Sequence, residues 1–164
     1  TEELVNQDVA IEVIKNFAGV PHRIELVKTI DDVKWYNDSA STSPSRLISG
    51  LNAFNETIIL IAGGADKNLD YSPVGKPILS KVRKLLLIGQ TAEKIYKAVE
   101  NASKEEQKTI DIEKCKTLEE TVKLARKYAR PGEVVLFSPA STSFDMFKDM
   151  YDRGNQFKEL VNNL

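Results

Sequence analysis

The stretch TIILIAGG, at residues 57–64, decides the fold of this 164-residue chain. Five apolar residues follow one another in it, and a pair of glycines ends the run. Such an uninterrupted apolar run is typical of a strand that is buried on both faces of a sheet. Two later stretches repeat the pattern, KLLLIGQ at residues 84–90 and EVVLFSP at residues 133–139. These three stretches predict a sheet with mostly parallel strands, because helices cover both faces of such sheets.

The segments between these strands have helical spacing. TAEKIYKAVENA at residues 91–102 is amphipathic, and TLEETVKLARKYA at residues 117–129 begins with a capping box from Thr117 to Glu120. Residues 72–82 indicate a broken helix with Pro77 inside it, and residues 108–115 a weaker strand. Strands that alternate with helices predict βαβ units with right-handed crossovers.

The outer segments complete the fold prediction. Residues 22–30 alternate Ile24, Leu26 and Ile30 with polar residues, and VKWYND at residues 33–38 follows, which indicates a β-hairpin. A helix with Pro44 in its first turn is expected next, with Leu47, Ile48 and Leu51 on its inner face. The last segment, residues 143–163, is predicted to be a helix with an interruption near Arg153–Gly154. The predicted fold class is α/β, a Rossmann-like, mostly parallel sheet flanked by helices, with an N-terminal β-hairpin.

Composition and motifs exclude several classes of function. The 23 basic and 24 acidic residues give a net charge of −1, unlike the basic footprint of a nucleic-acid binder. No apolar run approaches the roughly 18 residues of a membrane span. The sequence contains neither a phosphate-binding P-loop nor the G-x-G-x-x-G dinucleotide motif. One histidine, His22, and one cysteine, Cys115, cannot build a usual zinc site, and no metal site or catalytic residue is predicted.

Small polar residues follow several predicted strands. They lie at residues 36–45, 63–68, 89–94 and 138–145, just before predicted helices. Ligands bind at the carboxyl ends of the strands in such sheets, and free N–H groups of helix starts suit carboxylates or phosphates. Each place also has an ordinary structural explanation. The serines can be helix caps, the glycines can allow a tight turn, and Lys67 can be a solvated lysine. Thr91 is interpreted as a helix cap only.

Convergence of these loops favours a binding site. Three of them should meet at one edge of the sheet, where a lysine and two hydroxyl-bearing loops form a plausible receptor for a small dicarboxylate.

At these same loops the sequence resembles the C-terminal domain of the Mur ligases. The matching pieces are GVPHRIE at residues 19–25, WYNDSASTSP at 35–44, ILIAGGADKNLDY at 59–71 and LFSPASTSFDMFKDMYDRGNQF at 136–157. The last piece, together with GG-x-DK, favours the D-glutamate-adding branch of the family. The resemblance covers nearly the whole chain from Gly19. Residues 1–18 resemble the closing helix of the family's central ATPase domain, so the domains are expected at 1–18 and 19–164.

The resemblance implies a mechanism and a set of partners. ATP, with Mg²⁺, would phosphorylate the terminal carboxylate of UDP-N-acetylmuramoyl-L-alanine, and the amine of D-glutamate would attack the resulting acyl phosphate. The residues that correspond to D-glutamate contacts in the family are Thr42, Lys67, Ser143 and Phe144. Arg23 and Asp38 would reach the nucleotide of ATP. The protein would be cytoplasmic, and this part alone would bind weakly and catalyse nothing, because the central domain holds most of the ATP site.

Two departures from the family pattern affect this prediction. Ala40 stands where the family often has a lysine that contacts ATP phosphate, and Ser43 replaces an asparagine. Met150 occupies a position where an aromatic residue is common. Two other functions stay open from the sequence: another amide ligase of the superfamily, similar to folylpolyglutamate synthase, and a Rossmann-like binding domain without enzymatic activity.

Overall fold

A computed structural model describes residues 19–164 of the chain, together with residues 9, 11 and 12. The helix and the domain boundary predicted over residues 1–18 therefore lie largely outside the described residues, and their packing stays a prediction.

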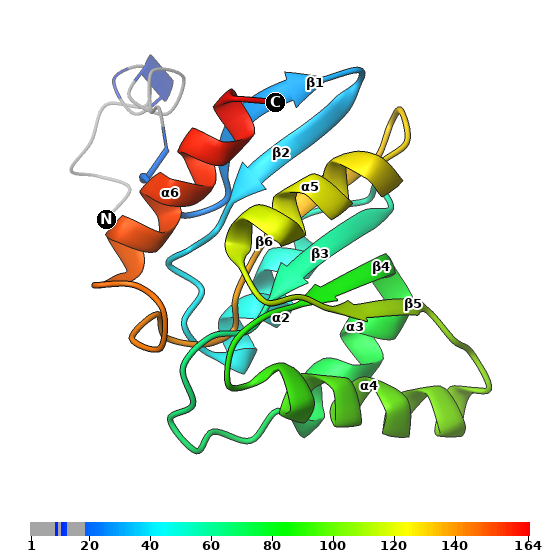
Figure 1. The fold of residues 1–164 in the computed structure, drawn as a ribbon. Helices are drawn as coiled ribbons and strands as arrows, with labels where there is room; N and C mark the ends of the chain where they lie inside the picture. Colours follow the sequence, from blue (N-terminus) through cyan, green and yellow to red (C-terminus); the bar gives the residue numbers. More distant parts are fainter. Residues whose placement is uncertain (1–8, 10, 13–18) are drawn as a thin grey trace.

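Within the described residues, one sheet of six strands forms the centre of the molecule (Figure 1). Its strand order is β1-β2-β6-β3-β4-β5. β1 and β2 pair antiparallel, whereas all other neighbouring strands pair parallel. This arrangement confirms the predicted mostly parallel sheet with an N-terminal hairpin. The strands are β1 (Glu25–Ile30), β2 (Val33–Asn37), β3 (Ile58–Ala62), β4 (Val82–Leu87), β5 (Asp111–Lys114) and β6 (Val134–Phe137).

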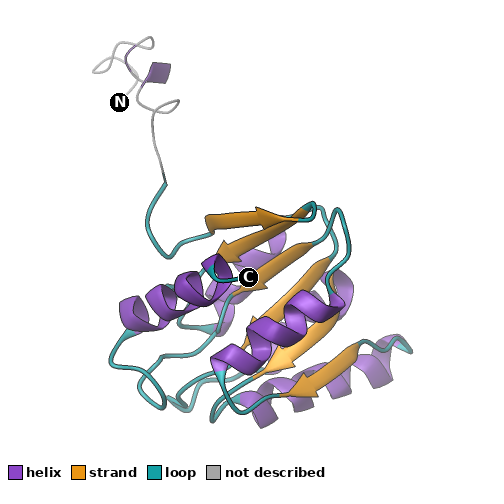
Figure 2. Cartoon of the chain, turned by 45° about the horizontal axis from the view of Figure 1, so that its top comes forward, coloured by secondary structure: helices purple, strands orange, loops and turns teal. Residues whose placement is uncertain are grey.

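Helices cover both faces of the sheet (Figure 2). One face carries α2 (Pro44–Asn52), the 3-10 turn η1 (Ser72–Val74), α3 (Gly75–Lys81) and α4 (Ala92–Glu106). The other face carries α5 (Leu118–Tyr128) and α6 (Met150–Asn162). The broken helix predicted around Pro77 is therefore confirmed as η1 followed by α3. Pro77 lies in the first turn of α3, where its missing N–H removes no helical hydrogen bond.

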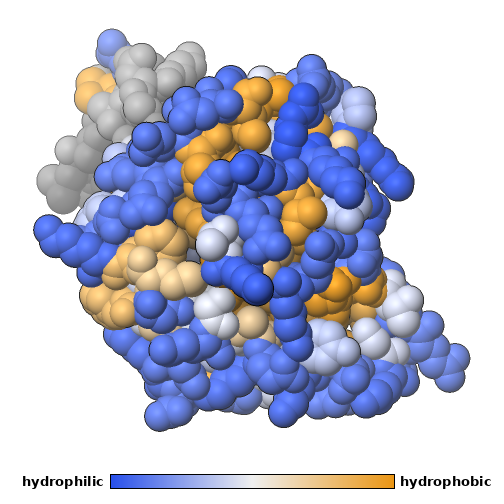
Figure 3. Space-filling view, in the orientation of Figure 1, coloured by the Kyte–Doolittle hydropathy of each residue, from blue (hydrophilic) through white to orange (hydrophobic). Residues whose placement is uncertain are grey.

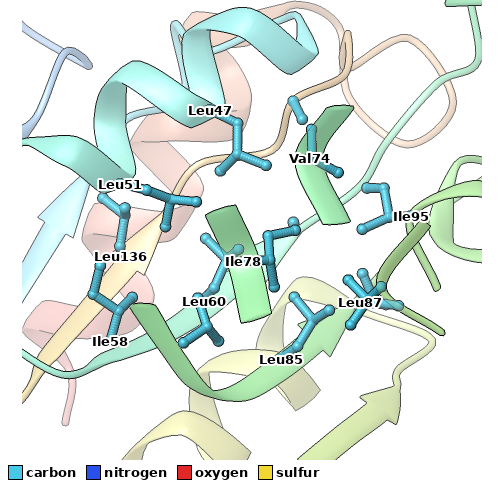
Figure 4. Close-up of a cluster of buried hydrophobic side chains, with 14 of the residues drawn as sticks. Leu47, Leu51, Ile58, Leu60, Val74, Ile78, Leu85, Leu87, Ile95 and Leu136 are labelled. Atoms are coloured by element: carbon cyan, nitrogen blue, oxygen red, sulfur yellow. The ribbon is translucent and has the colours of Figure 1, made fainter. Parts of the chain in front are cut away.

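Two hydrophobic cores explain why the central strands are apolar throughout. Ile58 and Leu60 of β3 face the core under α2, α3 and α4, whereas Ile59 and Ile61 face the core under α5 and α6. Figure 4 shows Leu47 and Leu51 of α2 pointing toward these β3 side chains. Each such buried side chain stabilises the fold by roughly 1.5–3 kcal/mol. By contrast, the outer face in Figure 3 is mostly hydrophilic, with separate apolar patches.

The structure corrects the predicted inner face of the first strand. Leu26 is 52% exposed, whereas Val27 and Ile30 pack against the second core. A bulge between Leu26 and Lys28 shifts the pairing of β1 with β2. An extra residue of this kind changes which side chains point inward, and simple alternation in the sequence does not reveal it.

The predicted interruption of the last helix is wrong. α6 runs without a break through Arg153 and Gly154, and the irregular part lies earlier, before Asp149. Asp149 caps the helix, because its Oδ1 accepts hydrogen bonds from the N–H groups of Tyr151 and Asp152, both at 2.8 Å. Gly154 serves close packing instead, since a Cβ there would collide with the ring of His22.

Candidate functional site

The loops after β3 and β6 are joined by backbone hydrogen bonds. We call residues 63–68 the β3 loop and residues 138–145 the β6 loop. The Gly63 N–H donates to the Pro139 carbonyl at 2.8 Å, and the Ala65 N–H donates to the Thr142 carbonyl at 2.8 Å. Two of the three loops predicted to hold a dicarboxylate therefore form one unit at the carboxyl edge of the sheet.

Glycine is required where these loops meet. Gly64 has a φ of +155°, and a Cβ on it would collide with the Thr142 carbonyl oxygen. A Cβ on Gly63, at φ +113°, would collide with the backbone of Ile88. The glycine pair therefore allows three chain segments to approach one another closely.

Thr91 has a larger role than the predicted helix cap. It occupies the N-cap position of α4, but its side chain makes no capping hydrogen bond. Its Oγ1 instead accepts from the Gly64 N–H at 3.1 Å and lies 2.8 Å from the Ser141 hydroxyl. The interpretation of Thr91 as a cap only is therefore wrong, because the side chain ties the loop after β4 to both the β3 and β6 loops.

Arg153 connects a third loop to this unit. We call residues 38–43 the β2 loop. The Arg153 guanidinium donates to the Ser39 hydroxyl at 3.0 Å, to the Ser39 carbonyl at 2.8 Å and to the Ser141 carbonyl at 3.0 Å. The side chain is 1% exposed, and this burial lowers the pKa of Arg153 to about 10. Sequence reasoning did not assign Arg153 to the site, although it lies in the motif at residues 136–157.

The predicted D-glutamate residues lie on these joined loops. The Lys67 ammonium is 5.8 Å from the centre of the Phe144 ring, so these two residues lie next to each other. Ser143 precedes Phe144 and is only 1% exposed, whereas Phe144 is 66% exposed. Thr42 is half-buried on the β2 loop, which hydrogen bonds of Ser39 and Arg153 connect to the β6 loop.

Two buried polar atoms of the β6 loop lack a hydrogen-bond partner within the described part of the chain. They are the hydroxyl of Thr142 and the Oδ1 atom of Asp145, both on the β6 loop. An unpaired buried polar group destabilises a fold by about 1–3 kcal/mol. Such groups are uncommon in native structures, and a ligand at the site is one way to satisfy them.

Arg23 and Asp38 line one small cleft beside the β2 loop, as expected if both contact the same ligand. The cleft has a volume of about 180 Å³ and is also lined by Ser41, Arg46 and Gly50. Asp38 is 5% exposed and accepts hydrogen bonds from the Ser138 hydroxyl at 2.8 Å and the Ile24 N–H at 3.3 Å. Burial raises the pKa of Asp38, although these hydrogen bonds and two nearby arginines oppose the change.

The backbone next to this cleft is strained. Ile24 has a φ of +47°, in the left-handed region that β-branched residues rarely adopt. Strain of this kind costs of order 1–3 kcal/mol and is often found at functional sites. The hydrogen bond from its N–H to Asp38 helps to hold this conformation.

Other features of the described residues lie outside this site. The part of the chain that the structure describes contains no group of histidine, cysteine, aspartate and glutamate side chains placed to hold a metal ion. No described helix is long and apolar enough to cross a membrane.

Burial raises the pKa of the Cys115 thiol to about 11, and neighbouring glutamates add to the effect, so this cysteine is not an activated nucleophile. A wider hollow of about 600 Å³, lined by α5 and α6 residues such as Leu118 and Leu160, contains none of the predicted site residues.

Comparisons with known proteins show which family this chain is similar to. Residues 22–141 match the model of the family described as Mur ligase, glutamate ligase domain. The chain is 51% identical over 164 residues to the UDP-N-acetylmuramoylalanine--D-glutamate ligase of Acetivibrio thermocellus, covering 99% of this chain and 35% of that protein. It is 46% identical over 166 residues to the enzyme of the same name from Ruminiclostridium cellulolyticum, covering 36% of it. The chain thus spans about a third of the length of these relatives.

A solved structure shares the fold at low sequence identity. The murein peptide ligase of Psychrobacter arcticus aligns with a TM-score of 0.59 and 12% identity, covering 94% of this chain and 33% of that one. At this level of identity the likeness shows the fold alone.

Proposed function

The chain belongs to the family of Mur ligase glutamate ligase domains, and from that premise we propose that it is the C-terminal, D-glutamate-binding domain of an ATP-dependent ligase. The whole enzyme would join D-glutamate to UDP-N-acetylmuramoyl-L-alanine in the synthesis of peptidoglycan precursors. The two curated relatives at 46% and 51% identity support this substrate pair.

The junction of the β3 and β6 loops carries the proposal. It places the Lys67 ammonium beside Phe144, on a platform that the Ala65–Thr142 hydrogen bond holds in place. D-Glutamate has two carboxylates, and Lys67 would pair with one of them by a charge-assisted hydrogen bond. The Thr42 and Ser143 hydroxyls and the backbone N–H of Phe144 would orient the rest of the amino acid.

This domain would contribute position rather than a reacting group. When bound, ATP supplies the phosphoryl group that activates the terminal carboxylate of the nucleotide substrate. The amine of D-glutamate then attacks the activated carbonyl carbon, phosphate leaves, and an amide forms. When the domain holds the amine in line with that carbon, the two reactants no longer have to meet by diffusion, and the step becomes effectively unimolecular. This positioning is a large part of catalysis in such ligations.

The cleft around Arg23 and Asp38 suits part of a nucleotide. The buried Ser41 hydroxyl lines this cleft and lacks a partner among the described residues. The cleft's two guanidinium groups suit phosphate, and the carboxylate suits a ribose hydroxyl. Its volume of about 180 Å³ is below the roughly 300–1,000 Å³ of complete small-molecule sites. Most of the ATP and its Mg²⁺ would therefore contact the central domain, of which residues 1–18 would be the end.

The test is a ligation assay with the full-length enzyme and, separately, with residues 1–164. With ATP, UDP-N-acetylmuramoyl-L-alanine and D-glutamate, we expect the full-length enzyme to release phosphate and form the amide. L-Glutamate should not replace D-glutamate. Residues 1–164 alone should be inactive, and the enzyme should act in the cytoplasm. Glutamylation of a folate by the full-length enzyme, without activity on the muramoyl substrate, would show instead a folylpolyglutamate-synthase-like function.

A further inference from the structure

The cleft around Asp38 contains a cation that the resemblance did not assign. Arg46, in the first turn of α2, lines the cleft together with Arg23. The β2 loop itself offers no positive charge, because Ala40 stands where the related family often has a lysine. Any second positive charge for a phosphate must therefore come from another element.

The charges of the cleft show why a second arginine matters. Asp38 carries one negative charge when ionised, and Arg23 alone would only balance it. With Arg46 the lining groups have a net charge of +1, which favours an anion. Neither arginine forms a salt bridge with a carboxylate elsewhere in the described residues, so neither is already neutralised.

A buried hydroxyl points to a ligand at the same place. Ser41 is 2% exposed, lines the cleft, and has no hydrogen-bond partner for its Oγ among the described residues. A phosphate oxygen would accept a hydrogen bond from it. Arg46 also lies on a helix anchored by Leu47 and Leu51, both fully buried, so its backbone is held in a fixed position.

We infer that Arg46, together with Arg23 and the Ser41 hydroxyl, binds a phosphate of the nucleotide and replaces the positive charge that the β2 loop lacks at Ala40. This inference rests on the proposed function and adds a residue to its nucleotide site. Arginine suits the task because its planar guanidinium can donate two parallel hydrogen bonds to phosphate.

Binding of ATP to the full-length enzyme, measured by calorimetry without the other substrates, tests the inference. Arg46→Ala should raise the Kd for ATP about ten- to a hundredfold, as expected for the loss of a charge-assisted hydrogen bond. The Michaelis constant for D-glutamate should change less than about twofold, because its proposed receptor lies on the β3 and β6 loops. An unchanged Kd for ATP would overturn the inference.

A rescue variant separates charge from structure. In the Arg46→Ala background, Ala40→Lys should recover part of the lost ATP affinity, because it places a positive charge on the β2 loop next to Ser41, which lines the cleft. A purely structural role of Arg46 would not be rescued, so a double variant that binds ATP as weakly as Arg46→Ala would contradict the inference. The matched control is Arg130→Ala, an exposed arginine before the amino end of β6, which should leave ATP binding unchanged.

Folding and function are checked separately. Arg46 is exposed, so its replacement leaves the core intact, and the thermal midpoint should stay close to that of the wild type. If Arg46→Ala nevertheless lowers the midpoint, Arg46→Gln, which keeps most of the side chain, should show the same loss of ATP affinity. Absence of ligase activity in the wild type would refute the proposed function, whereas the Kd for ATP tests Arg46 without turnover.

Discussion

The cations at the two ends of the sheet have different surroundings. Near the amino ends of β4 and β6, Arg83 donates two hydrogen bonds to the Glu133 carboxylate, at 2.7 and 2.8 Å. In the same region the Lys84 ammonium lies 2.9 Å from the Asp111 carboxylate and 2.8 Å from that of Glu113. Both cations are therefore neutralised within the domain.

Cations at the carboxyl ends of the strands mostly lack such partners. Two of them are paired: Lys94 with Asp66 at 2.7 Å, and Lys114, the last residue of β5, with Glu93 at 2.5 Å. Four others form no salt bridge with the described residues: Arg23, Arg46, Lys67 and Arg153. Charged side chains therefore serve different purposes at the two ends of the sheet. Paired charges hold the amino end together, whereas the positive charge left at the carboxyl end is available to anionic ligands or, for Arg153, to backbone carbonyls.

Among the variants that test this difference between the two ends of the sheet, Arg153→Ala should produce the largest effect. It removes three hydrogen bonds and leaves the Ser39 and Ser141 carbonyls without this partner, so the β2 loop is held less firmly against the β6 loop, although the Ser138 hydroxyl still donates to Asp38. We expect the kcat/KM of the full-length ligase to fall at least a hundredfold, which corresponds to about 2.7 kcal/mol. Steady-state kinetics provides the measurement.

Hydrogen exchange separates this effect from general unfolding. Amides of the β2 loop should exchange faster in Arg153→Ala, while amides of β3 and β4 should keep their protection. Arg153→Lys should recover only part of the activity, because an ammonium cannot reproduce the three contacts. Equal exchange rates in the β2 loop of the wild type and Arg153→Ala would contradict the role given to Arg153.

Lys67→Ala should have the next largest effect. Loss of a charge-assisted contact should raise the Michaelis constant for D-glutamate about ten- to a hundredfold, with little change in that for ATP. Lys104→Ala is the matched control, because Lys104 is an exposed lysine on α4 that pairs only with Glu100 among the described residues. If Lys67 is simply a solvated surface lysine, both variants will behave like the wild type.

Glu133→Gln should have the smallest effect and should act on stability alone. Burial by itself would raise the pKa of Glu133, but the hydrogen bond from Arg83 and the other contacts outweigh it and lower the pKa. The ion pair therefore stabilises the fold above the ordinary glutamate pKa, and this contribution is lost as the pH falls through the lowered value. We expect Glu133→Gln to lower the free energy of unfolding by about 1–3 kcal/mol at neutral pH.

Denaturant unfolding at several pH values measures this effect. The difference between the wild type and Glu133→Gln should shrink below about pH 4.5, and the Michaelis constants of the full-length enzyme should not change. A large rise in the Michaelis constant for either substrate would show that the amino end is not purely structural.

The sequence predicted the sheet well because its strands have a local signature. β3, β4 and β6 are apolar runs whose side chains alternate between the two cores. The loops that follow them lie at the carboxyl edge of the sheet, as predicted. The contacts of Arg153 with Ser39 could not be predicted, because they join residues 114 positions apart. The second role of Thr91 could not be predicted either, because it depends on the close approach of Gly64. The exposure of Leu26 depends on a bulge in the pairing of β1 with β2.

An NMR titration of residues 1–164 with D-glutamate tests the central claim most directly. We predict that the largest amide shifts occur in the β2, β3 and β6 loops, at residues such as Thr42, Lys67 and Ser143. Amides of Arg83, Lys84 and Glu133 at the amino end should stay unchanged, and L-glutamate should cause smaller shifts. Shifts centred on the amino end, equal responses to both enantiomers, or no shifts in the three loops would contradict the account.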